Sequence, residues 1–279
     1  MTAAQAPLVS VILLTIDRPQ FIGAAIQSVV NQSYSTWELI VLHDGPDPRI
    51  EPVVAEYSSR DSRVRYIHRE NIGNIASGLN CAIRRSRGEF IAILDDDDAW
   101  IEPKKLDRQV AALLSDVALV AIGGGAIVVD SSGREVMRYR RSIDPEECVR
   151  RALLANPVIH STVLYRRDAA ERVGLYDESL AGYQDWDLFL KIMRIGKVAN
   201  LEDFFATYRI WDGGGTSRRV LGNAWSAVRI VKRHGRYYRG YLLALAGSFA
   251  YVAFALLPRA VRCRSYQSLS RLKKRVFST

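Results

Sequence analysis

The stretch VSVILLTIDRPQFIGAAIQSVV, residues 9–30, decides the fold class, because an apolar run passes directly into an amphipathic helical pattern. The run 8–15 has the length and composition of a buried strand. Pro19 then suits the first turn of a helix, where its missing N–H is not needed. The apolar face of this helix consists of Ile22, Ala25, Ile26, Val29 and Val30. A strand joined to a helix in this way is the repeating unit of an α/β protein.

The same alternation continues along residues 8–120 and predicts a mostly parallel central sheet flanked by helices. Further strands are expected at 38–42, 64–67, 90–94, 117–122 and 126–129, the last two on either side of Gly123-Gly124-Gly125. Further helices are expected at 50–58, 75–87 and 103–114. The second half is less regular and predicts an α+β region folded onto the first. Its expected elements are strands at 160–165 and 204–210 and a helix at 183–194.

The composition is that of a globular protein, with 48% hydrophobic and 25% charged residues among 279. Cys81, Cys148 and Cys263 are odd in number and widely spaced, which indicates neither a disulfide framework nor a cysteine zinc site. Residues 1–7 carry no basic side chain, and the apolar run after them ends at Thr15, so the N-terminus does not have the pattern of a secretory signal. We therefore expect a reducing, cytoplasmic setting.

The positive charge of the chain lies at its C-terminal end. The formal net charge is +9, but residues 213–279 hold 14 Lys or Arg and no Asp or Glu, which leaves a net charge of −5 on residues 1–212. A nucleic-acid partner is not expected, because the body lacks a basic excess. We expect 1–212 to form the catalytic domain. We expect 213–279 to form a basic, apolar helical tail that holds the protein peripherally on the anionic inner face of the cell membrane.

Within this tail, basic helices are expected at 220–234 and 265–277, around the uncharged stretch 241–257. That stretch has 17 residues, close to the lower limit for a transmembrane helix, which needs about 20 apolar residues. Three interpretations remain open. The stretch can span a membrane, lie in its interface with the flanking tyrosines and arginines as anchors, or pack as a buried helix on the catalytic body.

The acidic run Asp95-Asp96-Asp97-Asp98 directly follows a predicted strand, at the strand end where open α/β sheets bind ligands. Neighbouring carboxylates repel one another, so such a cluster favours a divalent cation with oxygen ligands, and Mg²⁺ or Mn²⁺ would complete its shell with substrate phosphates. The alternative is an acidic flank for the helix after Pro103, where carboxylates also favour the helix dipole.

Two further polar positions follow predicted strands. Asp44 comes directly after 38–42, where its carboxylate could accept a proton from a nucleobase such as uracil, although Asp before Gly45 is also a common turn pair. Asn71, followed by Gly73, is a candidate for substrate binding, although Asn is also a common helix N-cap.

Taken together and in order, several segments resemble the inverting glycosyltransferases of family 2, which have the GT-A fold. The resemblance is close over residues 8–110 and looser up to Ser217. The segments are VSVILLTIDRPQFIGAAIQSVVNQSY at 9–34, WELIVLHDG at 37–45, ENIG at 70–73, GEFIAILDDDDAW at 88–100, HSTVLYRRD at 160–168, GYQDWDLFLKI at 182–192 and TYRIWDGGGTS at 207–217. The resemblance implies a transferase that moves a sugar from a nucleotide-diphosphate donor to an acceptor hydroxyl.

The resemblance also implies roles for single residues. Thr15 and Asp44 would line the nucleoside pocket, with a preference for a UDP-sugar. Asp97 would hold the metal that bridges the diphosphate, and Asp95 would face the ribose or the same cation. Asp96 and Asp98 are possible substitutes, and Asp96 is a further candidate for substrate binding. Asp185 would be the base that deprotonates the acceptor, with Asp187 next in line; the alternative is that Asp185 only caps its helix.

The chain departs from the family pattern at three positions. His43 stands where many members have an Asp, Gln184 replaces the usual Glu before Asp185, and Trp211 stands where many members have a His. The last change puts diphosphate contact from that strand in doubt, so Arg218, with Arg219, is the candidate for clamping the diphosphate. Both arginines can equally be the first basic residues of the tail.

Other functions would use a similar site. A sugar nucleotidyltransferase would carry a Gly-rich phosphate loop after the first strand, which residues 15–19 lack. A catalytically inactive, membrane-attached scaffold of the same fold is the second alternative, and the retained acidic residues speak against it. The basic tail favours a glycan or lipid-linked acceptor of the cell envelope.

Overall fold

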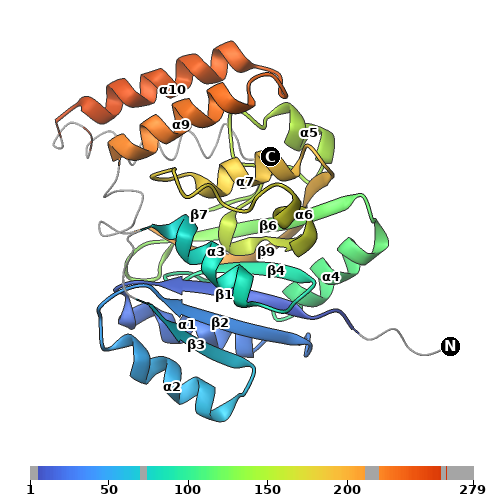
Figure 1. Ribbon diagram of the computed structural model, residues 1–279, viewed down its shortest axis with the longest axis vertical. Helices are drawn as coiled ribbons and strands as arrows, with labels where there is room; N and C mark the ends of the chain where they lie inside the picture. The colour runs from blue at the N-terminus through green and yellow to red at the C-terminus, as the bar shows by residue number, and fades with distance from the viewer. Residues whose placement is uncertain (1–5, 70–73, 211–219, 259–261, 263–279) are drawn as a thin grey trace.

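The computed structural model describes residues 6–69, 74–210, 220–258 and 262, and its centre is a nine-stranded sheet (Figure 1). The strands are β1 Val9–Thr15, β2 Trp37–His43, β3 Val64–His68, β4 Phe90–Asp95, β5 Ala99–Trp100, β6 Leu119–Val129, β7 Glu135–Tyr139, β8 Leu164–Arg166 and β9 Lys197–Arg209. The helices are α1 Pro19–Val30, α2 Ile50–Arg60, α3 Ile75–Arg85, α4 Lys105–Ser115, α5 Pro145–Arg150, α6 Arg167–Arg172, α7 Gln184–Ile192, α9 Val220–His234 and α10 Tyr241–Leu256, with a 3-10 turn, η1, at His160–Thr162. The strand order is β3-β2-β1-β4-β8-β6-β9-β5, and β7 pairs with β6.

The first half of the sheet is parallel, as the alternating sequence predicts. β1 lies between β2 and β4 and runs parallel to both, and β3 runs parallel to β2. β8 is antiparallel to β4 and β6, whereas β6 and β9 run parallel to each other. The α/β fold with a central sheet and flanking helices is therefore confirmed.

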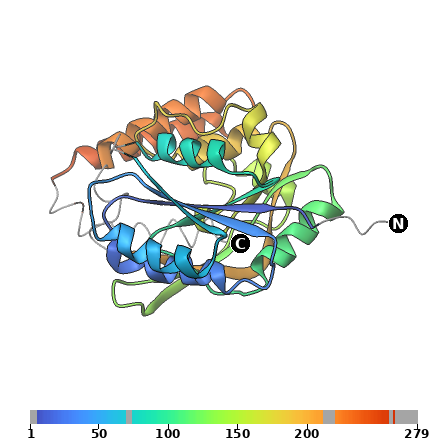
Figure 2. The ribbon, with the colours of Figure 1, turned by 60° about the horizontal axis from the view of Figure 1, so that its bottom comes forward.

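Two helical layers cover the sheet, and the alternation of side chains along the strands assigns each residue to one of them. In β1, Ile12 faces the layer of α3, α6, α7 and α9, whereas Val11 and Leu13 face the layer of α1, α2 and α4. β2 and β4 alternate in the same way. Figure 2 shows α1 and α2 below the sheet and α3 above it. The central strands are buried on both faces, which explains their continuous apolar runs.

The prediction of two strands around Gly123-Gly124-Gly125 is wrong, because β6 passes through the glycines as one strand of 11 residues. A β-carbon on Gly124 would stand 2.3 Å from the Phe205 ring, and one on Gly125 would stand 2.6 Å from the Phe204 ring. These glycines therefore let the β9 aromatic rings pack against the β6 backbone and do not make a turn.

The strand predicted at 160–165 is also only partly correct. Residues 160–162 form the turn η1, and the strand β8 begins at Leu164. Thr162 accounts for this turn, since its hydroxyl donates to the carbonyl of Ile159 at 2.8 Å. The turn places Ser161 and His160 beside the acidic run, where a continued strand would not.

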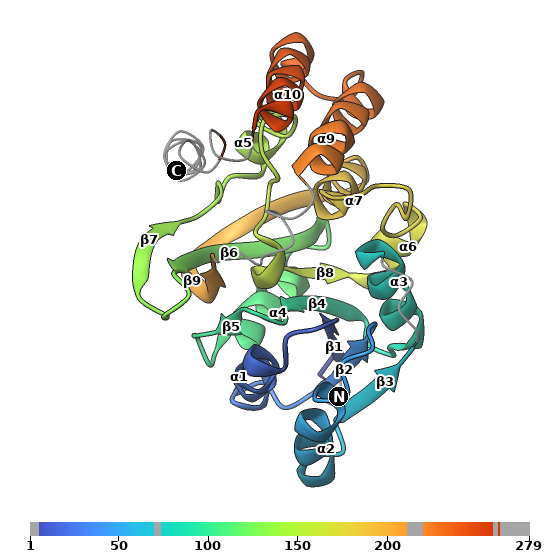
Figure 3. The same ribbon diagram turned by 90° about the vertical axis from the view of Figure 1, so that its left-hand side faces the viewer.

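The helices expected at 220–234 and 241–257 are present as α9 and α10. They pack on each other, and α9 lies between α10 and α7 (Figure 3). Ala227, Ile230 and Val231 of α9 join the same core as α7, so α9 packs on the α/β body. The basic helix predicted at 265–277 lies outside the described residues. Across the described part of the chain, no helix combines the length and the apolar character that crossing a bilayer requires.

Candidate active site

Three of the predicted site residues meet at the carboxyl edge of the parallel strands. Thr15 ends β1 and is aligned with His43 at the end of β2, directly before Asp44. On the other side of β1, Leu14 is aligned with Asp95 at the end of β4. The parallel register therefore brings Thr15, Asp44 and Asp95 to one edge, as expected for an open α/β sheet.

Asp44 is fully buried and held by an arginine that the sequence analysis did not single out. The Arg69 side chain donates to both carboxylate oxygens of Asp44, from Nε at 2.7 Å and from Nη2 at 2.9 Å. The Asp44 backbone N–H donates to the carbonyl of Thr15 at 2.8 Å. This bidentate pair fixes the orientation of the Asp44 carboxylate. The sequence feature that could have identified Arg69 is its position directly after the β3 strand.

The four carboxylates of the acidic run divide into a buried pair and a more open pair. Asp98 accepts from the Ser161 hydroxyl and from the Arg209 backbone N–H at 2.9 Å, and Asp96 accepts from Arg18 Nη1 at 2.5 Å. The Asp95 side chain is 42% exposed, and that of Asp97 is 13% exposed. The two positions that match the family's metal-binding pattern are therefore the less buried ones, and Asp98 has a structural role.

The surrounding protein does not fully neutralise the negative charge of the acidic run 95–98. Burial raises the pKa of Asp96 to about 7, although Arg18 counteracts it, and the charge of Asp97 adds to the rise. Burial, together with Asp97 and Asp95, raises the pKa of Asp98 well above its ordinary value. A divalent cation near Asp95 and Asp97 would favour the ionised forms of all four groups.

The residues present fit a metal that also needs substrate phosphates. In the described residues, no three Asp, Glu, His or Cys side chains form a group that could ligate a metal ion by themselves. Mg²⁺ and Mn²⁺ bound together with a nucleotide commonly use only one or two carboxylates and complete their shells with phosphate and water. Asp95 and Asp97 supply two such carboxylates. Arg18 Nη1 lies 3.1 Å from Asp97, so a cation at this position would compete with that ion pair.

Asp185 lies in the first turn of α7 and is half-buried. Its Oδ2 accepts from the side-chain amide of Asn156 at 2.6 Å, which fixes the carboxylate and leaves its other oxygen for a substrate proton. Asp187 is not an alternative base. Its carboxylate is fully buried against α9, where it contacts His234 at 2.9 Å and Arg233 at 3.0 Å.

His160 connects the acidic run to the α7 side of the site and is absent from the sequence-predicted residues. Its Nδ1 lies 3.3 Å from Asp95 Oδ1, and its Nε2 lies 3.0 Å from the Tyr176 hydroxyl. Burial alone would lower the pKa of His160, but the charges of Asp95 and Asp185 outweigh this effect and raise it. Both carboxylates therefore act on one imidazole. The sequence feature that could have identified His160 is its place at the start of the segment HSTVLYRRD.

Asn71, Arg218, Arg219 and Trp211 lie outside the described residues. The adjoining Arg209 backs the acidic run, since its Nε donates to the carbonyl of Asp97 at 3.2 Å. The two-residue strand β5 pairs with β9 and holds Asp98 next to Arg209.

Comparisons with known proteins find glycosyltransferases among the relatives of this chain. An uncharacterized glycosyltransferase of Methanocaldococcus jannaschii is 28% identical over 233 residues, which is 82% of this chain and 79% of the relative. The putative teichuronic acid biosynthesis glycosyltransferase TuaG of Bacillus subtilis is 24% identical, over 80% of this chain and 85% of that protein.

Two solved structures share the fold. The mannosyltransferase of Pyrobaculum calidifontis in complex with GDP-Man and Mn²⁺ superimposes with a TM-score of 0.66 at 18% identity, over 96% of this chain and 81% of that one. TarS 1–349 of S. aureus in complex with UDP-GlcNAc gives a TM-score of 0.65 at 16% identity, over 92% of this chain and 74% of that one.

The family model described as glycosyl transferase family 2 matches residues 10–174, more than half of the chain. This span includes Thr15, Asp44 and the whole acidic run. The chain therefore belongs to glycosyl transferase family 2 and is a glycosyltransferase.

Proposed function

We propose that this enzyme transfers a sugar, with inversion, from a nucleotide-diphosphate donor to an acceptor hydroxyl, in the synthesis of a cell-envelope or lipid-linked glycan. The observation that carries the proposal is a pair of carboxylate sites near His160: Asp95 lies 3.3 Å from its Nδ1, and the charge of Asp185 also raises the pKa of this histidine. One site suits a charged diphosphate and the other suits a proton acceptor. The fixed Asp44 favours a uracil base in the donor. One solved structure of similar fold holds GDP-Man and another holds UDP-GlcNAc, so donors with guanine and with uracil are both to be tested.

The proposed reaction is a single displacement at the anomeric carbon. The acceptor oxygen attacks that carbon, and its proton passes to the free oxygen of Asp185. The bond between the anomeric carbon and the diphosphate oxygen breaks, and its electron pair leaves with the diphosphate. Asp95 and Asp97 would hold Mg²⁺ or Mn²⁺, which offsets the charge on the departing group. Asn156 keeps the Asp185 carboxylate in place, and His160 keeps the Asp95 carboxylate in place.

Replacing Asp97 with Ala is expected to weaken metal-dependent nucleotide binding by about 10- to 100-fold, the loss of one contact to a charged group. Calorimetry with UDP, GDP and their sugars, in Mn²⁺ or in chelator, measures it. Asp116→Ala, an exposed aspartate outside the site, should bind like the wild type. Nucleotide binding by the wild type that is the same in Mn²⁺ and in chelator would count against the metal assignment. So would an Asp97→Ala variant that binds nucleotide as tightly as the wild type.

The membrane partner of residues 213–279 is part of the same proposal. α10 turns small residues such as Ala244 and Val252 towards the protein and leaves large apolar side chains exposed. Leu242 is 78% exposed and Leu256 is 69% exposed. Arg236 and Arg239 precede this helix, so an uncharged apolar face lies beside basic residues, the pattern of a helix in an anionic membrane interface. This arrangement supports a peripheral position on the inner face of the membrane and a lipid-linked acceptor.

The double substitution Leu242→Glu and Leu256→Glu is expected to remove most binding to vesicles of phosphatidylglycerol and phosphatidylcholine, because it places two charges on the apolar face. Co-flotation of the full-length protein with the vesicles measures this binding. Leu114→Glu and Val117→Glu, on the opposite layer, form the matched control, since both side chains are also highly exposed. If both double variants float like the wild type, α10 does not dock on the membrane.

A further inference from the structure

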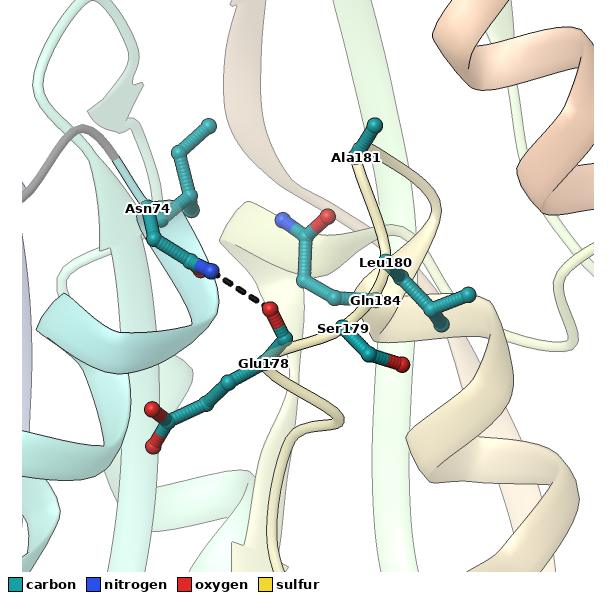
Figure 4. Close-up of a pocket in the computed structure, with 7 residues that line it drawn as sticks. Asn74, Glu178, Ser179, Leu180, Ala181 and Gln184 are labelled. Atoms are coloured by element: carbon teal, nitrogen blue, oxygen red, sulfur yellow. Dashed lines mark hydrogen bonds between the residues drawn. The ribbon is translucent and has the colours of Figure 1, made fainter.

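A cavity of about 200 Å³ lies directly beside the catalytic helix, between the start of α3 and the segment that leads into α7 (Figure 4). Its lining residues are Asn74, Ile75, Glu178, Ser179, Leu180, Ala181 and Gln184. Gln184 immediately precedes Asp185 in the first turn of α7. At about 30 Å³ of liquid volume per water, the cavity has room for about seven water molecules, a volume comparable with one sugar ring.

Gln184 carries the uncommitted polar group of this cavity. Asn74 donates to the carbonyl of Glu178 at 2.5 Å and caps α3 by accepting from Ser77. The Glu178 carboxylate is turned towards Asn80, which donates to it at 2.8 Å. Among the described residues, none makes a hydrogen bond to the Gln184 amide, and Figure 4 shows that amide pointing into the space beside Asn74 and Ala181. A free primary amide both donates and accepts, as hydroxyl groups require.

The backbone before Gln184 is held in an unusual conformation. Tyr183 has a φ of 58°, which is rare for a bulky residue and persists only where the surroundings enforce it. Its ring packs edge-on against Trp186 at 6.2 Å, and its hydroxyl lies 3.5 Å from that of Tyr251 on α10. The neighbouring Ala181 N–H donates to the Ser226 hydroxyl of α9 at 3.2 Å. These contacts hold the backbone of Tyr183 in place and therefore fix the orientation of the following residues, Gln184 and Asp185, at the start of α7.

We propose that this cavity is a subsite for the acceptor, a hydroxylated sugar ring, and that Gln184 is a specificity-determining residue that hydrogen-bonds its hydroxyl groups. This inference rests on the proposed function, since it takes Asp185 as the base. The charged part of the donor is assigned to Asp44, Asp95 and Asp97 at the strand ends. The cavity offers a neutral amide instead, on the residue that directly precedes Asp185 in the first turn of α7. A site of this kind rejects analogues that lack the recognised hydroxyl, because its polar group is then left unpaired.

The test uses octyl glycosides of glucose, galactose and N-acetylglucosamine as acceptor probes, with full-length protein, UDP or GDP, and Mg²⁺. Ligand-observed saturation-transfer NMR measures glycoside binding without needing turnover. At least one glycoside should bind the wild type, and Gln184→Leu, which keeps the size but removes both hydrogen-bonding functions, should weaken it about tenfold. Gln184→Glu keeps an acceptor and should retain more binding than Gln184→Leu. Gln27→Leu, an exposed glutamine on α1, is the matched control.

The outcomes separate this inference from the proposed function. If nucleotide binds the wild type but glycoside binding is absent, or is equal in wild type and Gln184→Leu, the acceptor subsite is wrong and the donor site stands. If Gln184→Leu weakens a nucleotide sugar but not the bare nucleotide, the cavity holds the donor's sugar, which also overturns the inference. If no nucleotide binds the wild type, the proposed function itself fails. Glycoside binding that depends on Gln184, with nucleotide binding unchanged, supports the subsite.

Discussion

Asp185→Asn is expected to lower the rate of sugar transfer by about 10²- to 10⁴-fold, the usual contribution of a positioned general base. The substitution keeps the shape of the side chain, and the new amide oxygen can still accept from Asn156. It removes the group that takes the acceptor proton. Nucleotide binding should not change, because Asp44 and the acidic run are untouched. Release of UDP or GDP from the matching nucleotide sugar, with and without acceptor, measures the rate.

Asp168→Asn provides the matched control, because Asp168 is an exposed aspartate in the first turn of another helix, α6. It should transfer sugar at the wild-type rate. Residual transfer by Asp185→Asn above about a tenth of wild type would mean that Asp185 only stabilises the first turn of α7 and its contact with Asn156. Asp187 could not then take over, because it is buried against α9. A base would have to come from the substrate or from another part of the site.

The sequence predicts the parallel half of the fold because that information is local. Each strand of the first half is an apolar run that directly adjoins a helical pattern, and β1, β2, β3 and β4 appear within a few residues of the expected positions. The glycine run at 123–125 misled the prediction for a physical reason. Glycine marks both turns and close packing, and only the position of the β9 phenylalanines distinguishes the two.

The charged partners of the site could not be predicted, since they come from distant parts of the chain. Arg18 reaches Asp96 across 78 positions, and His160 reaches Asp95 across 65. Arginine after a strand or helix end is common, so neither Arg18 nor Arg69 is distinctive in the sequence. The acidic run itself was visible, but its division into buried and accessible carboxylates depends on Ser161 and Arg209.

Asp187→Asn is expected to lower the free energy of unfolding by about 3 to 5 kcal/mol, the usual cost of removing one member of a buried ion pair. The Asp187 carboxylate contacts Lys191 Nζ at 3.1 Å, in addition to His234 and Arg233. Without this charge, the fully buried His234 and the largely buried Lys191 lose their carboxylate partner. Since His234 and Arg233 belong to α9, the substitution also weakens the attachment of α9 to α7. Denaturant unfolding of the full-length protein measures the loss.

An exposed ion pair gives the control for this expectation. Asp203 pairs with Arg108, and both side chains are well exposed, so Asp203→Asn should cost at most about 1 kcal/mol.

The pH dependence of the unfolding free energy gives a second check on Asp187. Burial opposes ionisation of Asp187, but His234, Lys191 and Arg233 outweigh it and lower its pKa. Its contribution is therefore complete above the unfolded pKa of about 3.9 and is lost as the pH falls through the lower folded value. Equal losses for both variants at pH 7 would mean that α9 is held by apolar packing alone.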